Sequence, residues 1–163
     1  MKEKRHYTNQ ERHKIYTAPK VKLKNVPFLP KGKDVESYRC RKSVILEGIS
    51  LIKEPIYCPA LNAQVSLKRK GMDETLRYAS MDKKSTLYAL NLEQLLNGAV
   101  YICDLEPHSK FQQSFLKMHL LICPVSRYGY AKIIVGEYYK KELNKPNYTH
   151  YCVSKISLNQ IKK

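Results

Sequence analysis

Histidines in the last third of the chain are the side chains best suited to acid–base chemistry. His119 and His150 lie in β-rich segments that are predicted to be strands, and Glu74 lies in a short helical segment. Cleaving RNA without a metal needs a base for the 2′-hydroxyl proton, an acid for the 5′-oxygen and a cation for the phosphorane charge. We predict that His119, His150 and Glu74 supply the acid and the base. The alternative is that each histidine is a partly buried strand residue hydrogen-bonded to the backbone.

A run of cations precedes a predicted helix in the segment VSLKRKGMDETLRY. Alternation in AQVSLKRK predicts a strand with Lys68 and Lys70 on one face and Arg69 on the other. The helix that follows begins with free N–H groups and a dipole that favour an anion. We therefore predict that this junction binds phosphate. The competing interpretation is that Asp73 and Glu74 already satisfy the helix terminus, which leaves the cations in water.

Tyrosines mix with cations in the closing segments RYGY and GEYYKK. This mixture suits the stacking of single-stranded bases beside a basic groove. We predict that Arg127 and Tyr148 join the residues that bind nucleic acid or phosphate. Tyrosine is also a good strand former, so half-buried strands with solvated hydroxyl groups describe the pattern equally well.

Several metal-binding and nucleotide-binding motifs are absent from the sequence. H-E-x-x-H, a paired aspartate cluster and H-x-E with C-x-x-C do not occur, which excludes the usual ligands of zinc hydrolases, two-metal nucleases and zinc deaminases. Neither G-x-x-x-x-G-K-[ST] nor G-x-G-x-x-G is found. We therefore expect no metal and no cofactor.

The net charge of +16 over 163 residues indicates a polyanionic partner. Residues 1–33 hold ten Lys or Arg against two acidic residues, so half of the excess charge lies in this segment. Nucleic acid, with RNA favoured, is the predicted partner, and an anionic membrane surface comes second. An acidic protein partner is the alternative.

Five cysteines without a C-x-x-C pair argue against a disulfide framework and a thiolate-rich zinc site. They suit a reducing cytoplasm. The longest apolar run, SVILEGISLI, contains Glu47 and Gly48 and is too short to span a bilayer. The amino terminus has no apolar core of a secretory signal, so we expect a cytoplasmic protein without a transmembrane segment.

The chain length predicts one domain. Residues 1–33 mix cations with prolines and predict a basic, partly extended arm, in which KVKLKNV has the alternation of a short edge strand. Residues 34–163 are predicted to form a single α+β domain. A helix is expected in DVESYRCRKSVILEGISLIKEP, with Asp34 as its cap and Pro55 as its stop.

The remaining segments predict more helices and then a meander. AQVSLKRK is expected as a strand and MDETLRYASM as a short helix. A helix in KKSTLYALNLEQLLNG is expected to restart at Asn91, where Gln94 has capping-box spacing, and to end at Gly98 before the strand AVYICDL. Three β-rich segments follow, which indicates an antiparallel meander of about four strands.

The order of SLKRKG, a short helix, TLYALNLEQLLNGAVYI and the closing YAKIIVGEYY and YTHYCVSKI resembles the nuclease-like domains of polyvalent proteins from phages and conjugative elements. These domains are grouped with the barnase–EndoU–colicin–RelE superfamily of RNases. The resemblance covers residues 57–158. It implies helices packed on a four-stranded antiparallel sheet, and metal-independent RNA cleavage through a 2′,3′-cyclic phosphate. The polar positions of this sequence that the resemblance matches to the family are Lys68, Lys70, Glu74, His119 and His150.

We therefore predict an RNase-like effector of a mobile genetic element that acts on RNA phosphodiesters by acid–base catalysis. Two alternatives stay open. The first is a non-catalytic nucleic-acid-binding module that uses the same cations and tyrosines. The second is an interaction protein whose basic arm folds onto an acidic partner, as an antitoxin or immunity-like inhibitor requires.

Overall fold

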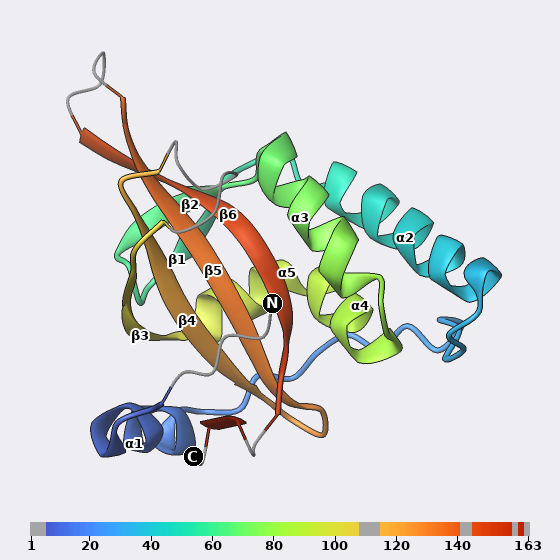
Figure 1. The fold of residues 1–163 in the computed structure, drawn as a ribbon, viewed down its shortest axis with the longest axis horizontal. Coiled ribbons are helices and arrows are strands. Elements are labelled where there is room, and N and C mark those ends of the chain that lie inside the picture. Colours follow the sequence, from blue (N-terminus) through green and yellow to red (C-terminus); the bar gives the residue numbers. More distant parts are fainter. Residues whose placement is uncertain (1–5, 108–114, 141–144, 158–159, 162–163) are drawn as a thin grey trace.

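Six strands form one curled sheet in the computed structural model of the protein (Figure 1). The structure describes residues 6–107, 115–140, 145–157 and 160–161. The helices are α1 (Asn9–Thr17), α2 (Val35–Ser50), α3 (Arg69–Ala79), α4 (Lys83–Leu90) and α5 (Leu92–Gly98). The strands are β1 (Ile56–Cys58), β2 (Ala63–Ser66), β3 (Val100–Leu105), β4 (Lys117–Val125), β5 (Gly129–Lys140) and β6 (Lys145–Ile156).

The strand order is β1-β2-β6-β5-β4-β3, so β1 and β3 are the edges. The predicted α+β class and the closing antiparallel strands are confirmed. The sheet is larger than the four strands expected, because the short β1–β2 hairpin adds two strands. It is also mixed, since β2 pairs with β6 in parallel. Strand β1 has only three residues, too few for alternation to stand out in a sequence, whereas the strand predicted for AQVSLKRK includes β2.

Helix α2 begins where the sequence predicts, because the side chain of Asp34 accepts a hydrogen bond from the backbone N–H of Ser37 at 3.1 Å. Ile45 and Ile49 are buried on its inner face. The break at Asn91 is also confirmed, since α4 ends there and α5 begins. Asn91 makes no capping bond to α5. Its side chain instead accepts from the backbone N–H of Lys24 at 2.9 Å and donates to the Lys24 carbonyl at 3.2 Å.

The strand predicted for AQVSLKRK is too long. Strand β2 ends at Ser66, and Lys68 is already the N-cap of α3, so Lys68 and Lys70 do not share a strand face. The first turn of α3 contains no acidic residue. Asp73 therefore lies in the second turn, and the interpretation that acidic side chains satisfy this helix terminus is wrong.

The extended arm expected for residues 1–33 contains a helix. Thr8 and Glu11 form a capping box at the start of α1, with hydrogen bonds of 3.1 and 2.9 Å. Ile15 of α1 is fully buried against the sheet. The edge strand expected around KVKLKNV is reduced to a single parallel bridge between Val21 and Val125.

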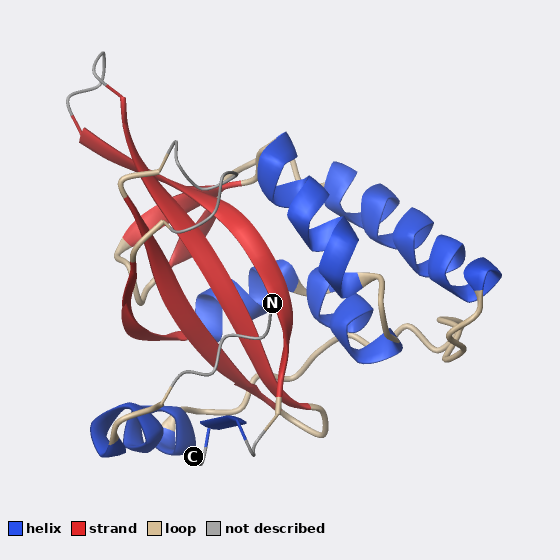
Figure 2. Cartoon of the chain, viewed as in Figure 1, coloured by secondary structure: helices blue, strands red, loops and turns tan. Residues whose placement is uncertain are grey.

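Figure 2 shows α2, α3 and α4 grouped on one side of the sheet, and α1 apart from them. The larger core lies between α2–α5 and the sheet, and a second core holds α1 against β3 and β4.

All five cysteines are free, and Cys58 and Cys123 are buried apolar core residues as expected. Within the described ranges, no helix combines the length and the apolar character that crossing a membrane requires.

Candidate acid–base site

Polar side chains form a row across four adjacent strands, from β3 to β6. Asp104 of β3 lies opposite His119 of β4, while Lys117 of β4 lies opposite Glu137 of β5 and Glu137 lies opposite Tyr148 of β6. Residues paired directly across a sheet point to the same face. Tyr101 reaches the same group through its hydroxyl. We call this group the His119 cluster, which consists of Tyr101, Asp104, Lys117, His119, Glu137 and Tyr148.

The imidazole of His119 lies between two carboxylates. Its Nε2 atom forms a hydrogen bond of 2.8 Å with Oε1 of Glu137. Its Nδ1 atom lies 2.8 Å from Oδ1 of Asp104, outside the alignment of a hydrogen bond. The side chains of His119 and Glu137 are 8% and 12% exposed, whereas Asp104 is 44% exposed. One carboxylate is therefore sheltered and the other faces water.

Asp104 is held in its charged form by its neighbours. The Tyr101 hydroxyl donates to Oδ1 at 2.6 Å, and Nζ of Lys117 lies 3.5 Å from Oδ2. Partial burial acts against the charge, but the hydrogen bond from Tyr101 and the positive charges of His119 and Lys117 together lower the pKa of Asp104. The cluster thus contains a carboxylate that stays ionised at neutral pH.

Two tyrosine rings flank His119. The ring centroids of Tyr148 and Tyr101 lie 5.6 and 6.1 Å from the imidazole. Burial and then the charge and hydrogen bond of Glu137 raise the pKa of Tyr148, while burial and the hydrogen bond to Asp104 raise that of Tyr101. Both phenols therefore stay protonated near neutral pH and serve as hydrogen-bond donors. In the described part of the chain, no group of three or more His, Cys, Asp or Glu side chains is arranged to hold a metal ion.

The second predicted histidine, His150, lies on the same face but does not contact His119. Val135 pairs with both residues and separates them by two strand spacings, about 10 Å. His150 is fully buried under α3, where its Nε2 atom lies 3.0 Å from the Thr75 hydroxyl. Burial lowers its pKa to about 4, so the ring is neutral at pH 7. This position is that of a packed, neutral side chain.

Glu74 also lies apart from the His119 cluster. It is on α3, and its carboxylate is 3.9 Å from the guanidinium of Arg77. The carboxylates beside His119 are instead Asp104 and Glu137, which the sequence reasoning missed. A signal was present for Asp104, which is the one charged residue of the strand VYICDL. Which strands pair, and in which register, is not visible in the sequence.

The predicted phosphate-binding residues fall in three places. Tyr148 belongs to the His119 cluster. Lys68 reaches Tyr138, with its Nζ atom 4.4 Å from the ring centroid and in contact with the hydroxyl. Arg127 lies in the turn after β4, and its φ is 73°. This turn is about 20 Å from His119, measured along β4. Arg69 and Lys70 begin α3, but their side chains are outside the described part of the structure.

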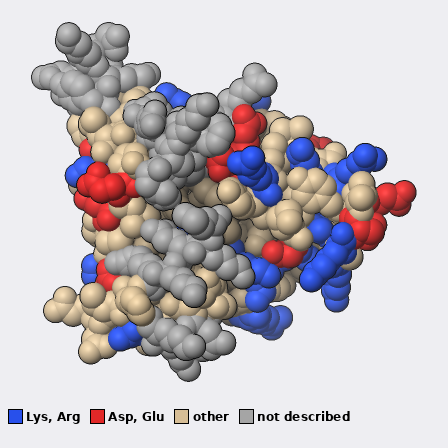
Figure 3. All heavy atoms as spheres, in the orientation of Figure 1, with Lys and Arg blue, Asp and Glu red and all other residues tan. Residues whose placement is uncertain are grey.

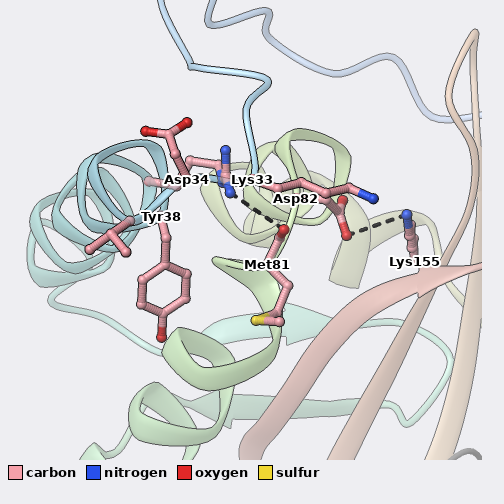
Figure 4. Close-up of a pocket in the computed structure, with 8 residues that line it drawn as sticks. Lys33, Asp34, Tyr38, Met81, Asp82 and Lys155 are labelled. Atoms are coloured by element: carbon pink, nitrogen blue, oxygen red, sulfur yellow. Dashed lines mark hydrogen bonds and ion pairs between the residues drawn. The ribbon is translucent and has the colours of Figure 1, made fainter.

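A cavity of about 450 Å³ lies near the N-termini of α2 and α4 (Figure 4). Four of its charged side chains have partners within the protein: Asp34, Arg41, Asp82 and Lys155. Asp34 caps α2, and Asp82 caps α4 and pairs with Lys155 at 3.3 Å. The buried guanidinium of Arg41 donates to the backbone carbonyls of Pro30, Gly32, Ser80 and Met81. These contacts join the start of α2 to the α3–α4 junction and give the cavity a structural role.

A comparison with protein families matches residues 45–151 to the family described as Large polyvalent protein-associated domain 3. The matched range includes every residue of the His119 cluster. No curated protein and no solved structure matches the chain.

Proposed function

Since the chain belongs to the large polyvalent protein-associated domain 3 family, we propose that it is an RNase-like module of a mobile genetic element. In this proposal it acts in the cytoplasm and cleaves RNA phosphodiesters at the His119 cluster. The observation that carries the proposal is the imidazole of His119 held at 2.8 Å from the sheltered carboxylate of Glu137. Paired proton-transfer groups of this kind are what RNA transesterification needs.

The proposed roles follow from the charges of the two groups. Glu137 takes the proton of the 2′-hydroxyl group, and the 2′-oxygen attacks phosphorus. The bond from phosphorus to the 5′-oxygen breaks, and His119 donates its proton to that oxygen. The products are a 2′,3′-cyclic phosphate and a 5′-hydroxyl group. The ring of His119 lies between the carboxylates of Asp104 and Glu137, a position that suits the role of the acid, and Lys117 supplies a cation for the phosphorane.

We also propose that the N-terminus of α3 binds a phosphate of the same RNA. Support comes from the cap, because Lys68 makes no side-chain capping bond and no acidic residue occupies the first turn. The backbone N–H groups and the dipole of α3 then favour an anion beside Lys68, Arg69 and Lys70. Figure 3 shows Lys and Arg side chains on the surface over the region of α2, α3 and α4. The exposed cations of these helices include Arg39, Lys42, Arg77 and Lys84.

The test is incubation of the full chain with labelled single-stranded RNA in excess EDTA. We expect products that end in a 2′,3′-cyclic phosphate, and no cleavage of an analogue that lacks the 2′-hydroxyl group at the cleaved position. His119→Gln is expected to lower the rate by about 100-fold or more, since general acid–base groups contribute that much. His13→Gln, which changes an exposed histidine of α1, is the matched control. Equal rates for the two variants would remove the proposed site.

A second candidate function is binding of RNA without turnover. It is favoured by the low exposure of His119 and Glu137 and by the hydrogen bond that already joins them. In that case the protein binds RNA with an affinity that falls steeply with salt, and no cyclic phosphate is formed. A filter-binding measurement with the same labelled RNA, run beside the cleavage assay, separates the two functions because it reports binding without turnover.

A further inference from the structure

A second cavity, of about 500 Å³, adjoins the His119 cluster at Tyr101. We call it the Tyr101 pocket. Three parts of the chain surround it: the C-terminal end of α1 and the residues after it, the β1–β2 turn, and the start of β3. Its size is within the range of small-molecule sites. It is lined by Lys14, Thr17, Ala18, Pro19, Pro59, Ala60, Ala99, Val100 and Tyr101.

We propose that the Tyr101 pocket binds one base of a single-stranded RNA whose backbone continues into the His119 cluster. This inference rests on the proposed function for its substrate, but it concerns a separate site with separate residues. The lining is apolar apart from one cation, one hydroxyl group and one phenol, and this combination suits a nucleotide. The base packs against apolar walls and the aromatic ring, and the cation meets the phosphate.

Lys14 supplies the cation. Its Nζ atom lies 5.8 Å from the centroid of the Tyr101 ring and donates to the Tyr101 carbonyl at 3.2 Å. Lys14 is exposed, so its ammonium group can move to contact a phosphate without first leaving a buried position. An ammonium over an aromatic ring at the mouth of an apolar pocket is complementary to an anionic ligand with a flat, apolar part.

The edge of the sheet supplies polar groups for recognition. Among the strands that the structure describes, β3 pairs with β4 alone, so its other side presents backbone N–H and C=O groups. The hydrogen bond from Lys14 to the carbonyl of Tyr101 places this edge toward the pocket. Backbone groups of this kind can hydrogen-bond the edges of a base.

Tyr101 connects the pocket with the acid–base groups. Its ring lines the pocket, its hydroxyl donates to Asp104 at 2.6 Å, and its centroid lies 6.1 Å from that of His119. This separation can be bridged by a single nucleotide. A base in the Tyr101 pocket thus sets which phosphodiester reaches His119, and the pocket is expected to influence the position of cleavage.

The first experiment maps the pocket by NMR without any need for cleavage. The full chain is titrated with nucleoside 3′-monophosphates, and with ribose 5-phosphate and inorganic phosphate as controls. We expect the backbone amides of Ala60, Ala99 and Tyr101 to shift with the nucleotides and not with the two controls. Equal shifts with ribose 5-phosphate would indicate a phosphate site without a base site and overturn the proposal.

The second experiment uses two variants with the same change in charge. Thr17→Glu places an anion at the Tyr101 pocket, and Val35→Glu places one at the cavity near α2; both positions are exposed and lie at a helix end. With a trinucleotide that is 2′-O-methylated and so cannot be cleaved, we expect Thr17→Glu to raise Kd about tenfold. Val35→Glu is expected to raise it less than twofold.

The outcomes separate this inference from the proposed function. Equal effects of Thr17→Glu and Val35→Glu would overturn the base site, even if the protein cleaves RNA. Amide shifts at the pocket together with a wild type that never cleaves RNA would overturn catalysis and retain the base site. Shifts caused by an acidic peptide but not by nucleotides would also overturn the base site.

Discussion

The Nε2 atom of His119 lies 2.8 Å from Oε1 of Glu137, although the two residues are 18 positions apart. The β4–β5 hairpin brings them together, because Lys117 pairs with Glu137 and so sets Glu137 diagonally across from His119. This relationship gives the first prediction. Glu137→Gln is expected to lower kcat/KM for RNA by about 100-fold or more, since the amide cannot accept the 2′-hydroxyl proton.

The matched comparison for that substitution is Glu74→Gln. Glu74 is the acid that the sequence reasoning selected, but it lies on α3 beside Arg77. Its substitution is expected to change kcat/KM less than threefold. Single-turnover cleavage assays measure both variants. A larger loss for Glu74→Gln than for Glu137→Gln would assign the base to α3.

The stability of the protein is predicted to fall in mild acid because of His150. Burial lowers its pKa to about 4 from an ordinary 6.5, so the folded state binds its proton less readily than the unfolded state. The resulting stabilisation is complete above pH 6.5 and is lost as the pH falls from 6.5 to 4. Between pH 7 and pH 5 the loss is about 2 kcal/mol. Urea unfolding at both pH values measures it, and His150→Gln should reduce the loss, whereas His13→Gln should not.

Replacing Arg41 is expected to destabilise the fold. Its guanidinium is 1% exposed and donates to four backbone carbonyls. Arg41→Met leaves these buried acceptors without donors, at a cost of about 3 kcal/mol. Arg39→Met, on the exposed side of the same helix, should cost less than about 0.5 kcal/mol. Denaturant unfolding of the two variants compares them, and equal costs would contradict the structural role of Arg41.

The cysteines are predicted to differ in reactivity. Cys40 is exposed on α2, whereas burial raises the pKa of Cys123 and of Cys152 to about 12. The thiolate is the reactive form, so Cys40 should react with an aromatic disulfide reagent before these two. Stopped-flow labelling at pH 8 measures the rates. Cys40→Ser is expected to remove the fastest phase, and its persistence would contradict the prediction.

The salt dependence of RNA binding tests the N-terminus of α3. Lys68→Gln is expected to reduce the slope of log K against log salt by about 0.7, the value for one phosphate contact on a single strand. Arg127→Gln removes the same charge at the other end of β4, about 20 Å from His119. Its effect on the binding of a trinucleotide at the His119 cluster should be smaller. Equal slopes for the two variants would contradict a phosphate site at α3.

Local features of the fold could be predicted from the sequence. Asp34 caps α2 as expected, and the capping-box spacing of Asn91 and Gln94 correctly predicted a new helix after Asn91, although Asn91 makes no side-chain capping bond there. The three β-rich closing segments correctly predicted β4, β5 and β6. Helix α1 was missed, although Thr8 and Glu11 have capping-box spacing that the sequence displays. These features depend on residues at most four positions apart, whose interactions form within one helical turn or one strand.

The tertiary structure decided which polar side chains meet. Asp104 and Glu137 reach His119 only because β3, β4 and β5 pair in one register, and a shift of one residue would turn His119 to the other face. His150 has the same residue type in the same kind of strand, but α3 covers it and keeps it neutral. Strand pairing and the packing of α3 on the sheet bring together segments that lie far apart in the chain. No local sequence pattern predicts these contacts. The sequence therefore indicated the types of group present, and the sheet decided which of them became neighbours.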